Sequence, residues 1–201
     1  MNETALARLL PRTPGNVRGQ ATLARLTLAA LDVAEREGVE ATTVDEICRV
    51  ADCSRRTFFH HFPSRDAALL GPAVPSVTPE AVAHYLAESG RILSGALQLV
   101  DVPPELAPTT PLGARRHALL QASPRLQAAA RARMLPAATA VLAAVTAKLA
   151  QQPTLDGETI PLTAQAVTAI VAGLVESAFT TGTNDPAATL DSLAPIWDQL
   201  R

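Results

Sequence analysis

The sequence predicts an all-α fold, on three observations. Alanine and leucine dominate its 201 residues, and aromatic side chains make up only 3% of them. The alternation of apolar and polar residues that marks half-buried strands is missing. Apolar residues recur instead every three or four positions, which is the spacing of one helix face. We therefore expect no strands, but an N-terminal three-helix unit with a helix-turn-helix, followed by a helical bundle.

Charge is local rather than global in this chain. Its 17 basic and 19 acidic residues give a net charge of −2, which by itself does not favour binding to nucleic acid. Basic residues nevertheless gather in residues 1–25 and 53–65, and the second segment contains no acidic residue. The distribution of charge, not its total, therefore singles out these two segments.

The two cysteines, Cys48 and Cys53, match neither the C-x2-C spacing of zinc sites nor a disulfide-rich scaffold. We interpret both as core thiols rather than as a redox or metal site. No uninterrupted apolar run approaches the roughly 18 residues of a membrane span, and the first residues do not resemble a signal peptide. These observations predict a cytoplasmic protein without a cofactor, a metal or a membrane partner.

The N-terminal segment is predicted to contain an arm and one helix. Residues 1–20 show no helical period and are expected to form a flexible basic arm; a plain disordered tail is the alternative. From Thr22 onward the apolar residues step by three and four as far as Gly38. This spacing predicts one amphipathic helix that the glycine ends.

Two short helices separated by a tight turn are predicted next. Thr43 and Glu46 form a capping box, in which the Thr43 hydroxyl accepts the Glu46 amide and the Glu46 carboxylate reaches back to the Thr43 amide. The first helix ends near Ala51, and Ser54 begins the second as an N-cap. Asp52 lies in the turn, where aspartate tolerates left-handed backbone. A helix-turn-helix is the simplest interpretation.

The remaining chain is predicted to form a bundle of at least five helices. Four helix starts share one sequence pattern, an N-cap residue followed by a proline. The fixed φ of proline suits the first turn of a helix. These starts are Thr78-Pro79, Thr110-Pro111, Ser123-Pro124 and Asp185-Pro186. A further helix is expected from near Thr163 to Gly182, and Pro136 is expected to bend or split the longest helix. The predicted domains after the arm are residues 21–70 and 76–201.

One continuous motif spans the predicted helix-turn-helix. It reads TTVDEI at residues 42–47 and ADCSRRTFFHHFPSR at residues 51–65. This motif resembles the DNA-binding signature of the TetR/AcrR family of transcriptional regulators, and the resemblance covers residues 22–70. The chain departs from the family at Asp52, where glycine is preferred, and at Phe59, where tyrosine is usual. The resemblance implies a regulator that binds double-stranded DNA.

The resemblance also implies which side chains meet DNA. Phe58 and Phe62 anchor the second helix, so that its exposed side fits a major groove about 12 Å wide. Arg55 and Arg56 are the expected base readers, because one arginine can bond O6 and N7 of guanine together, worth roughly 1–3 kcal/mol of discrimination. The full predicted set is Thr43, Ser54, Arg55, Arg56, Thr57, Phe59, His60, His61 and Arg65.

Phosphate contacts are expected from groups at helix starts and from the histidines. The groups concerned are Thr43, Ser54, His60 or His61, and Arg65. Arg65 stands where the family usually has a lysine that touches the backbone. Phe59 has no hydroxyl for a phosphate and is expected to pack on a sugar or a thymine methyl. A zinc site at His60 and His61 is not expected, because adjacent helical residues point about 100° apart.

A homodimer is expected because one helix-turn-helix reads only a few base pairs, and two half-sites about one helical turn apart give useful specificity. Two apolar faces near the C-terminal end are the candidate interface. They contain Val167, Ile170, Val171, Leu174, Val175 and Ala178, and then Leu190, Leu193, Ile196 and Trp197. Two such pairs make a four-helix bundle, as the resemblance also implies. The alternative is that these faces pack only within one chain.

A small-molecule effector is expected in the bundle, since alanine-rich helices with few large side chains leave room for a ligand. The candidate contacts are His84, Tyr85, His117, Gln121, Met134 and Glu176; ordinary surface or core roles are the alternative for each. Such an effector relieves repression if it binds more tightly to a dimer geometry in which the two DNA-reading helices do not fit into successive major grooves. The helix that starts at Arg65 is the expected mechanical link.

The predicted function is a ligand-responsive repressor that binds a palindromic operator as a dimer. A transcriptional activator and a constitutive DNA binder without an effector stay open as alternatives. A helical carrier or enzyme with a vestigial helix-turn-helix is the third, but the sequence contains no Gly-rich phosphate loop, H-E-x-x-H or G-x-S-x-G motif. We therefore expect no enzymatic activity.

Overall fold

The computed structural model describes residues 17–89, 91–153, 155–181 and 190. In these ranges the chain forms nine α-helices and one 3-10 turn, without any strand. A single isolated bridge joins Ser76 and Asp101. The all-α prediction is therefore confirmed. The chain divides into two compact units, Met1–Ala73 with Pro104–Ala132 and Val74–Pro103 with Arg133–Arg201.

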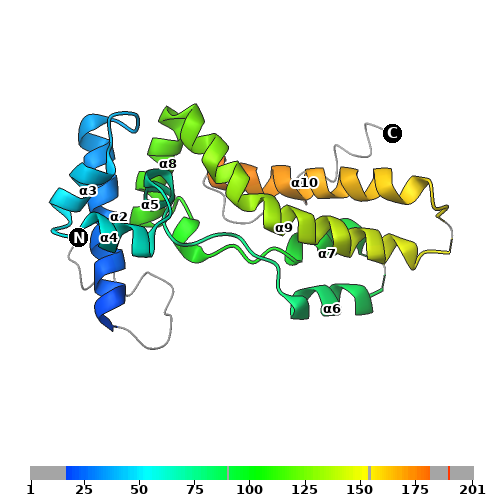
Figure 1. Ribbon diagram of the computed structural model, residues 1–201. Helices are drawn as coiled ribbons and strands as arrows, with labels where there is room; N and C mark the ends of the chain where they lie inside the picture. The colour runs from blue at the N-terminus through cyan, green and yellow to red at the C-terminus, as the bar shows by residue number, and fades with distance from the viewer. Residues whose placement is uncertain (1–16, 90, 154, 182–189, 191–201) are drawn as a thin grey trace. The chain divides into compact units, whose positions relative to one another are not determined.

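The first unit contains the predicted helix-turn-helix and a later segment of the chain (Figure 1). Its elements are α2 (Val17–Glu37), α3 (Val44–Val50), α4 (Arg55–His61), α5 (Arg65–Leu70), the 3-10 turn η1 (Pro104–Leu106), α8 (Pro111–Ala122) and the start of α9 (Pro124–Ala150). Because α2 begins at Val17, residues 17–20 of the predicted arm are helical, and the rest of that arm lies outside the described residues. Gly38, with φ +90°, follows α2 as predicted.

The later segment joins the first unit through its core. Leu112 and Leu119 on α8 and Leu126 on α9 are buried in the same cluster as Leu31 and Phe58. The prediction places a single boundary near residue 76. In the structure, residues 104–132 belong to the same unit as the N-terminal helices. The sequence pattern marks the ends of helices, but it does not reveal which core each helix completes.

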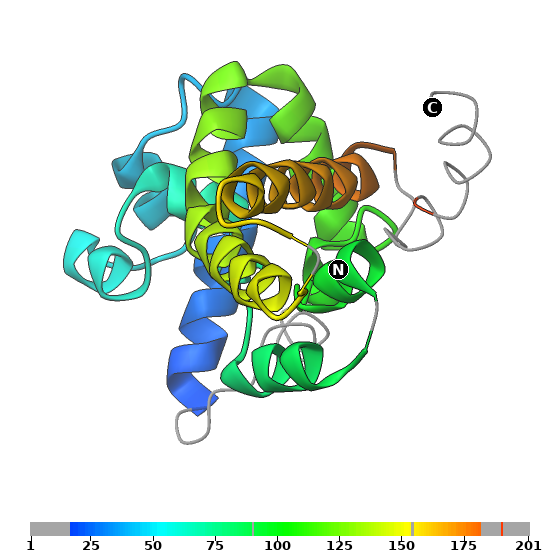
Figure 2. The same cartoon turned by 90° about the vertical axis from the view of Figure 1, so that its right-hand side faces the viewer.

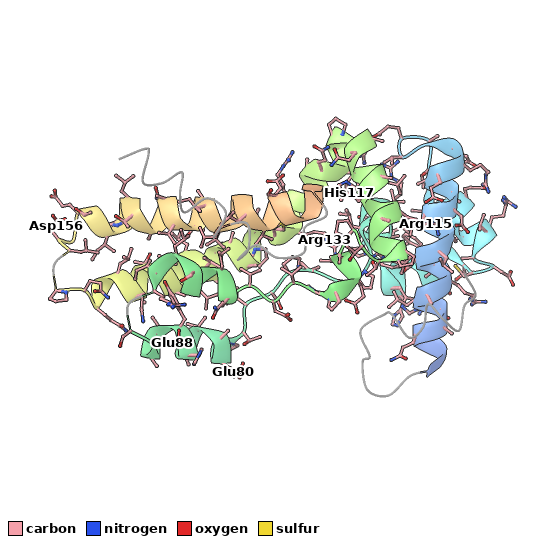
Figure 3. All side chains as sticks on the ribbon, turned by 180° about the vertical axis from the view of Figure 1, so that it is seen from behind. Glu80, Glu88, Arg115, His117, Arg133 and Asp156 are labelled. Carbon is pink, nitrogen blue, oxygen red and sulfur yellow. The ribbon has the colours of Figure 1, made fainter. Side chains whose placement is uncertain are left out.

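Charged side chains also hold α8 in this unit. Arg115 on α8 faces α2, where it pairs with Asp32 and Glu35 at 2.6 Å each (Figure 3). The guanidinium of Arg116 lies where a Cβ would stand on Gly71, the residue that follows α5 with φ +77°. A side chain at position 71 would therefore meet both backbone strain and the guanidinium.

The second unit is an apolar bundle of α6 (Pro79–Ala87), α7 (Ile92–Gln98), the rest of α9 and α10 (Thr159–Thr181). Figures 1 and 2 show α6 and α7 beside α9 and α10. Its core is built mainly from small and branched side chains on α7, α9 and α10. They include Ala96, Leu99, Val141, Ala144, Val145, Leu149, Val171, Leu174 and Val175.

The predicted helix starts are largely confirmed. Thr78 and Thr110 cap α6 and α8 through their hydroxyls, and the Ser123 hydroxyl accepts the amide of Leu126 in α9. Asp185 lies outside the described residues. Helix α10 begins at Thr159, earlier than the predicted Thr163, because the Asp156 carboxylate accepts the Thr159 amide at 2.7 Å.

Pro136 does not split the longest helix, which was one of the two outcomes predicted for it. It lies inside α9, which continues from Pro124 to Ala150. A proline in a helix interior removes the hydrogen bond to the carbonyl four residues earlier. Here both Pro136 and Ala132 are exposed, so water can satisfy the Ala132 carbonyl that the proline leaves without its helical donor.

One buried charge interrupts the apolar packing of the second unit. Lys148, the chain's single lysine, is only 2% exposed. Its ammonium donates to the carbonyls of Tyr85, at 2.7 Å, Leu86 and Glu88 at the C-terminal end of α6. It also lies 5.3 Å from the centroid of the Tyr85 ring. The lysine therefore satisfies carbonyls that the end of a helix leaves without backbone partners.

Two helices have the length and composition of a membrane span, although the sequence analysis expected none. They are α9 and the Thr159–Ser177 part of α10. Core helices of soluble proteins have the same properties, and Val141, Val145 and Val171 are buried in the unit's own core. The two helices are therefore weak evidence for a membrane.

Candidate nucleic-acid interface

The first helix of the helix-turn-helix is fixed at its start by Thr43. The Thr43 hydroxyl accepts the amide of Glu46 at 3.2 Å, as the capping box predicts. The reciprocal half of the box is replaced by ion pairs, because the Glu46 carboxylate accepts from Arg36 on α2 and Arg49 on α3. These pairs lower the pKa of Glu46, chiefly through the bond from Arg49. Glu46 therefore links α3 to α2 rather than capping α3.

The turn between α3 and α4 is a Schellman motif. Asp52 has φ +47°, the left-handed conformation predicted for it. Its amide donates to the Arg49 carbonyl at 3.4 Å, and the amide of Cys53 donates to the Cys48 carbonyl at 3.0 Å. These two bonds define the motif, in which the first and last residues also touch through their side chains. The turn thus ends α3 and directs the chain into α4.

Helix α4 is anchored on one side by two phenylalanines. Phe58 is fully buried, and Phe62, which follows the helix, is 2% exposed. Their ring centroids lie 6.0 Å apart. The helix begins at the Ser54 cap, whose hydroxyl accepts the amide of Thr57 at 3.0 Å. The predicted anchors and the predicted cap are both confirmed.

The opposite side of α4 is exposed and basic. Arg55, Arg56 and His60 are exposed, and Phe59 is 49% exposed. His61 is half-buried, and its pKa is lowered by burial and then by the charge of the adjacent His60. The two imidazoles stack edge to face rather than converging on one point, and no metal-binding cluster is found among the described side chains. This side carries donors for base edges and phosphates.

An acidic partner of Arg55 was missed by the sequence analysis. Asp45 on α3 accepts from the Arg55 guanidinium through both carboxylate oxygens, at 3.0 and 3.2 Å. Both side chains are largely exposed. The pair holds Arg55 extended between the two helices, and it places a carboxylate beside a predicted base reader. Asp45 lies ten positions before Arg55, a separation that neither helix period links.

Arg65 makes contacts within the protein, and its predicted phosphate contact stays a prediction. Its side chain is mostly buried and donates to the carbonyls of Glu40, at 3.3 Å, and Thr42, at 3.0 Å. It also pairs with Asp66. Arg65 therefore supports the loop that carries the Thr43 cap, and a phosphate contact requires its guanidinium to leave these carbonyls.

Comparison with known families agrees with this geometry. Residues 26–70 match the family model described as bacterial regulatory proteins, tetR family. Residues 26–70 are the helix-turn-helix region of a TetR family regulator. The match ends with α5 and does not reach the second unit. No curated protein matches the chain.

The candidate effector residues are divided between the units. His117 and Gln121 lie on α8 in the first unit, and the other four lie in the second. Tyr85 is buried and its hydroxyl donates to the Ile92 carbonyl at 3.1 Å, whereas His84 is exposed beside Glu88. A pocket of about 270 Å³ in the second unit has other lining residues. They are Glu88, Ser89, Arg91, Gly95 and Gln98. The effector contacts therefore stay a prediction.

The candidate dimer residues of the regulator lie on a helix face that already has a partner. Val171, Leu174 and Val175 are buried in the second unit's core, and Val167 and Ile170 pack partly against it. The Ala178 side chain and Leu193, Ile196 and Trp197 lie outside the described side chains. The opposite side of α10 is exposed and carries small or apolar residues beside Gln165 and Glu176. The small or apolar residues are Leu162, Ala166, Ala169 and Gly173.

Proposed function

We propose that this TetR family regulator is a ligand-responsive repressor, acting in the cytoplasm without enzymatic activity. The observation that carries the DNA-binding part is the exposed basic side of α4. Phe58 and Phe62 hold α4 on the core, so that Arg55 and Arg56 extend away from it. An α-helix presented in this way fits the major groove of B-form DNA, where arginine reads guanine.

Phosphate contacts are proposed from the groups that frame α4. Thr43 and Ser54 stand at the starts of α3 and α4, where amides and helix dipoles attract anions. His60 and Thr57 extend the same side, and Phe59 offers an apolar surface to a sugar or a thymine methyl. Arg65 contributes indirectly, because it supports the loop that carries Thr43. Its direct contact with a phosphate stays a prediction.

We propose that the regulator binds a palindromic operator as a homodimer. The side of α10 with Leu162, Ala166, Ala169 and Gly173 supports this, because small exposed side chains allow a second helix to approach closely. Leu162 on this side is 72% exposed. We therefore assign the contact to this side, and the buried face with Val171 and Leu174 to the internal core.

The experiment that tests the DNA-binding proposal measures affinity for the DNA upstream of the protein's own coding sequence. Fluorescence anisotropy with the double variant Arg55→Ala/Arg56→Ala is expected to show at least about a 30-fold loss, since each bidentate contact contributes roughly 1–3 kcal/mol. Arg131→Ala, which removes an exposed arginine on α9, is the matched control. Equal affinity of the double variant and the wild type would refute the assignment of base readers.

The same assay separates repression from its alternatives. A small molecule that lowers operator affinity supports a ligand-responsive repressor, because only differential affinity for two states shifts their equilibrium. Operator binding that no compound alters indicates a constitutive binder. Transcription in vitro that rises when the protein binds indicates an activator.

A further inference from the structure

Two cysteines lie on either side of the turn of the helix-turn-helix. Cys48 lies on α3, and Cys53 directly precedes Ser54, the N-cap of α4. They are the chain's only cysteines, and the amide of Cys53 donates to the carbonyl of Cys48 at 3.0 Å. Neither thiol has a part in the proposed reading of DNA.

The Schellman turn explains why these two residues lie next to each other. Its first and last residues are Cys48 and Cys53, joined by the 3.0 Å hydrogen bond from the Cys53 amide to the Cys48 carbonyl. A disulfide requires Cα atoms about 4.4–6.8 Å apart, and the backbone bond holds the two residues next to each other across the turn. Their backbones permit a covalent link, but the two free thiols must still move closer together to form it.

The two thiols differ in exposure. Cys48 is buried, whereas Cys53 is partly exposed. Burial, and then the contact with Cys53, raise the pKa of the Cys48 thiol to about 11. Because the thiolate is the nucleophile, Cys48 does not react first with an oxidant in solution. Cys53 is the accessible member of the pair.

We propose that Cys48 and Cys53 form a reversible disulfide when the protein meets hydrogen peroxide, and that this bond lowers operator affinity. The second half of this inference rests on the proposed function. The Cys53 thiolate attacks the peroxide, so that an S–O bond forms, the O–O bond breaks and the leaving oxygen departs as water after taking a proton. Cys48 then attacks the resulting sulfenic sulfur, the S–S bond forms, and the S–O oxygen leaves as a second water with the Cys48 proton.

The effect on DNA binding follows from what Cys53 is attached to. The two sulfurs must approach to about 2.05 Å, which draws Cys53 toward α3. Ser54 and Arg55 follow Cys53 directly, while Phe58 and Phe62 keep the other end of α4 on the core. The start of α4 therefore shifts relative to its end, and the two base-reading arginines lose their positions.

The test uses the full-length protein before and after brief treatment with hydrogen peroxide. Intact mass and peptide mapping are expected to show the loss of two hydrogens and a linked Cys48–Cys53 peptide. Operator affinity is expected to fall at least about 30-fold, the loss of two bidentate contacts worth at least about 1 kcal/mol each, and to return with dithiothreitol. Oxidation of Met134 is excluded as the cause, because dithiothreitol does not reduce a sulfoxide.

Cys53→Ser is the decisive variant, since a partly exposed position tolerates serine. It is expected to bind the operator like the reduced wild type and to keep that affinity in peroxide; Cys48→Ala should behave in the same way if it folds. No linked peptide, a linked peptide with unchanged affinity, or an equal loss in Cys53→Ser would overturn the proposal. Absence of binding by the reduced protein would instead refute the proposed function, and peptide mapping would still decide whether the disulfide forms.

Discussion

Each of the two units contains its own kind of polar link between helices. In the first unit, Arg115 reaches from α8 to two carboxylates on α2 at the surface. In the second, a long-range side-chain link is made by a buried ammonium, Lys148, surrounded by apolar side chains and backbone carbonyls. Salt weakens the first kind of link and hardly affects the second. The link between α8 and α2 is therefore more sensitive to salt concentration than the link made by Lys148.

The largest expected effect tests the core of the first unit. Phe58→Ala removes a fully buried ring and is expected to lower the free energy of unfolding by about 3–5 kcal/mol through lost burial and a cavity. Urea unfolding followed by circular dichroism measures this loss. Phe59→Ala, at the exposed neighbouring position, is the control and should cost no more than about 1.5 kcal/mol. Equal losses would show that Phe58 does not anchor α4.

The next effect tests the buried charge of the second unit. Lys148→Met keeps the length of the side chain but leaves the carbonyls at the end of α6 without their donor. We expect the free energy of unfolding to fall by about 1–3 kcal/mol, the cost of unsatisfied buried acceptors. Ala147→Met, which places the same side chain at the adjacent exposed position, is the control. A more stable Lys148→Met protein would mean that burying the charge costs more than its hydrogen bonds return.

A smaller effect tests the surface links of the first unit. Arg115→Ala removes both 2.6 Å ion pairs to α2 and is expected to cost about 1 kcal/mol at low salt and less at high salt. Thermal unfolding at two salt concentrations measures it. Arg125→Ala is the matched control, because its ion pairs are longer, at 3.4 and 3.8 Å. A loss independent of salt would assign the role of Arg115 to packing instead.

The smallest effect concerns the pH dependence of the first unit. The pKa of His61 is lowered in the folded chain by burial and by His60, so the unfolded chain binds the proton more readily. Stability should therefore fall as pH drops below the ordinary histidine pKa of about 6.5. His61→Gln is expected to flatten this fall by less than about 1 kcal/mol in urea titrations between pH 7 and 5. Measurements at pH 8 supply the reference, and an unchanged slope would contradict the shift.

Short-range features of the DNA-binding region could be predicted from the sequence. The Thr43 and Ser54 caps, the left-handed Asp52 and the anchors Phe58 and Phe62 each depend on residues within about one turn of one another. Such features follow from local spacing and side-chain chemistry. For this reason the helix-turn-helix and most helix starts of the bundle agree with the structure.

Long-range pairings could not be predicted in this way. The Asp45 partner of Arg55, the carbonyl partners of Arg65 and the return of residues 104–132 to the first unit all join positions that no helix period links. The apolar residues of α10 were visible in the sequence, but their spacing does not say whether one chain or two covers them. Only packing separated its internal face from its exposed one.

The burial of Lys148 also limits how the regulator can be modified. The chain has no other lysine, so no ε-amine is available at the described surface for enzymatic acetylation, a modification that cancels positive charge on many proteins. The arginines that face a polyanion keep their proton at any physiological pH. Neutralising that surface by acylation is therefore not open to this protein.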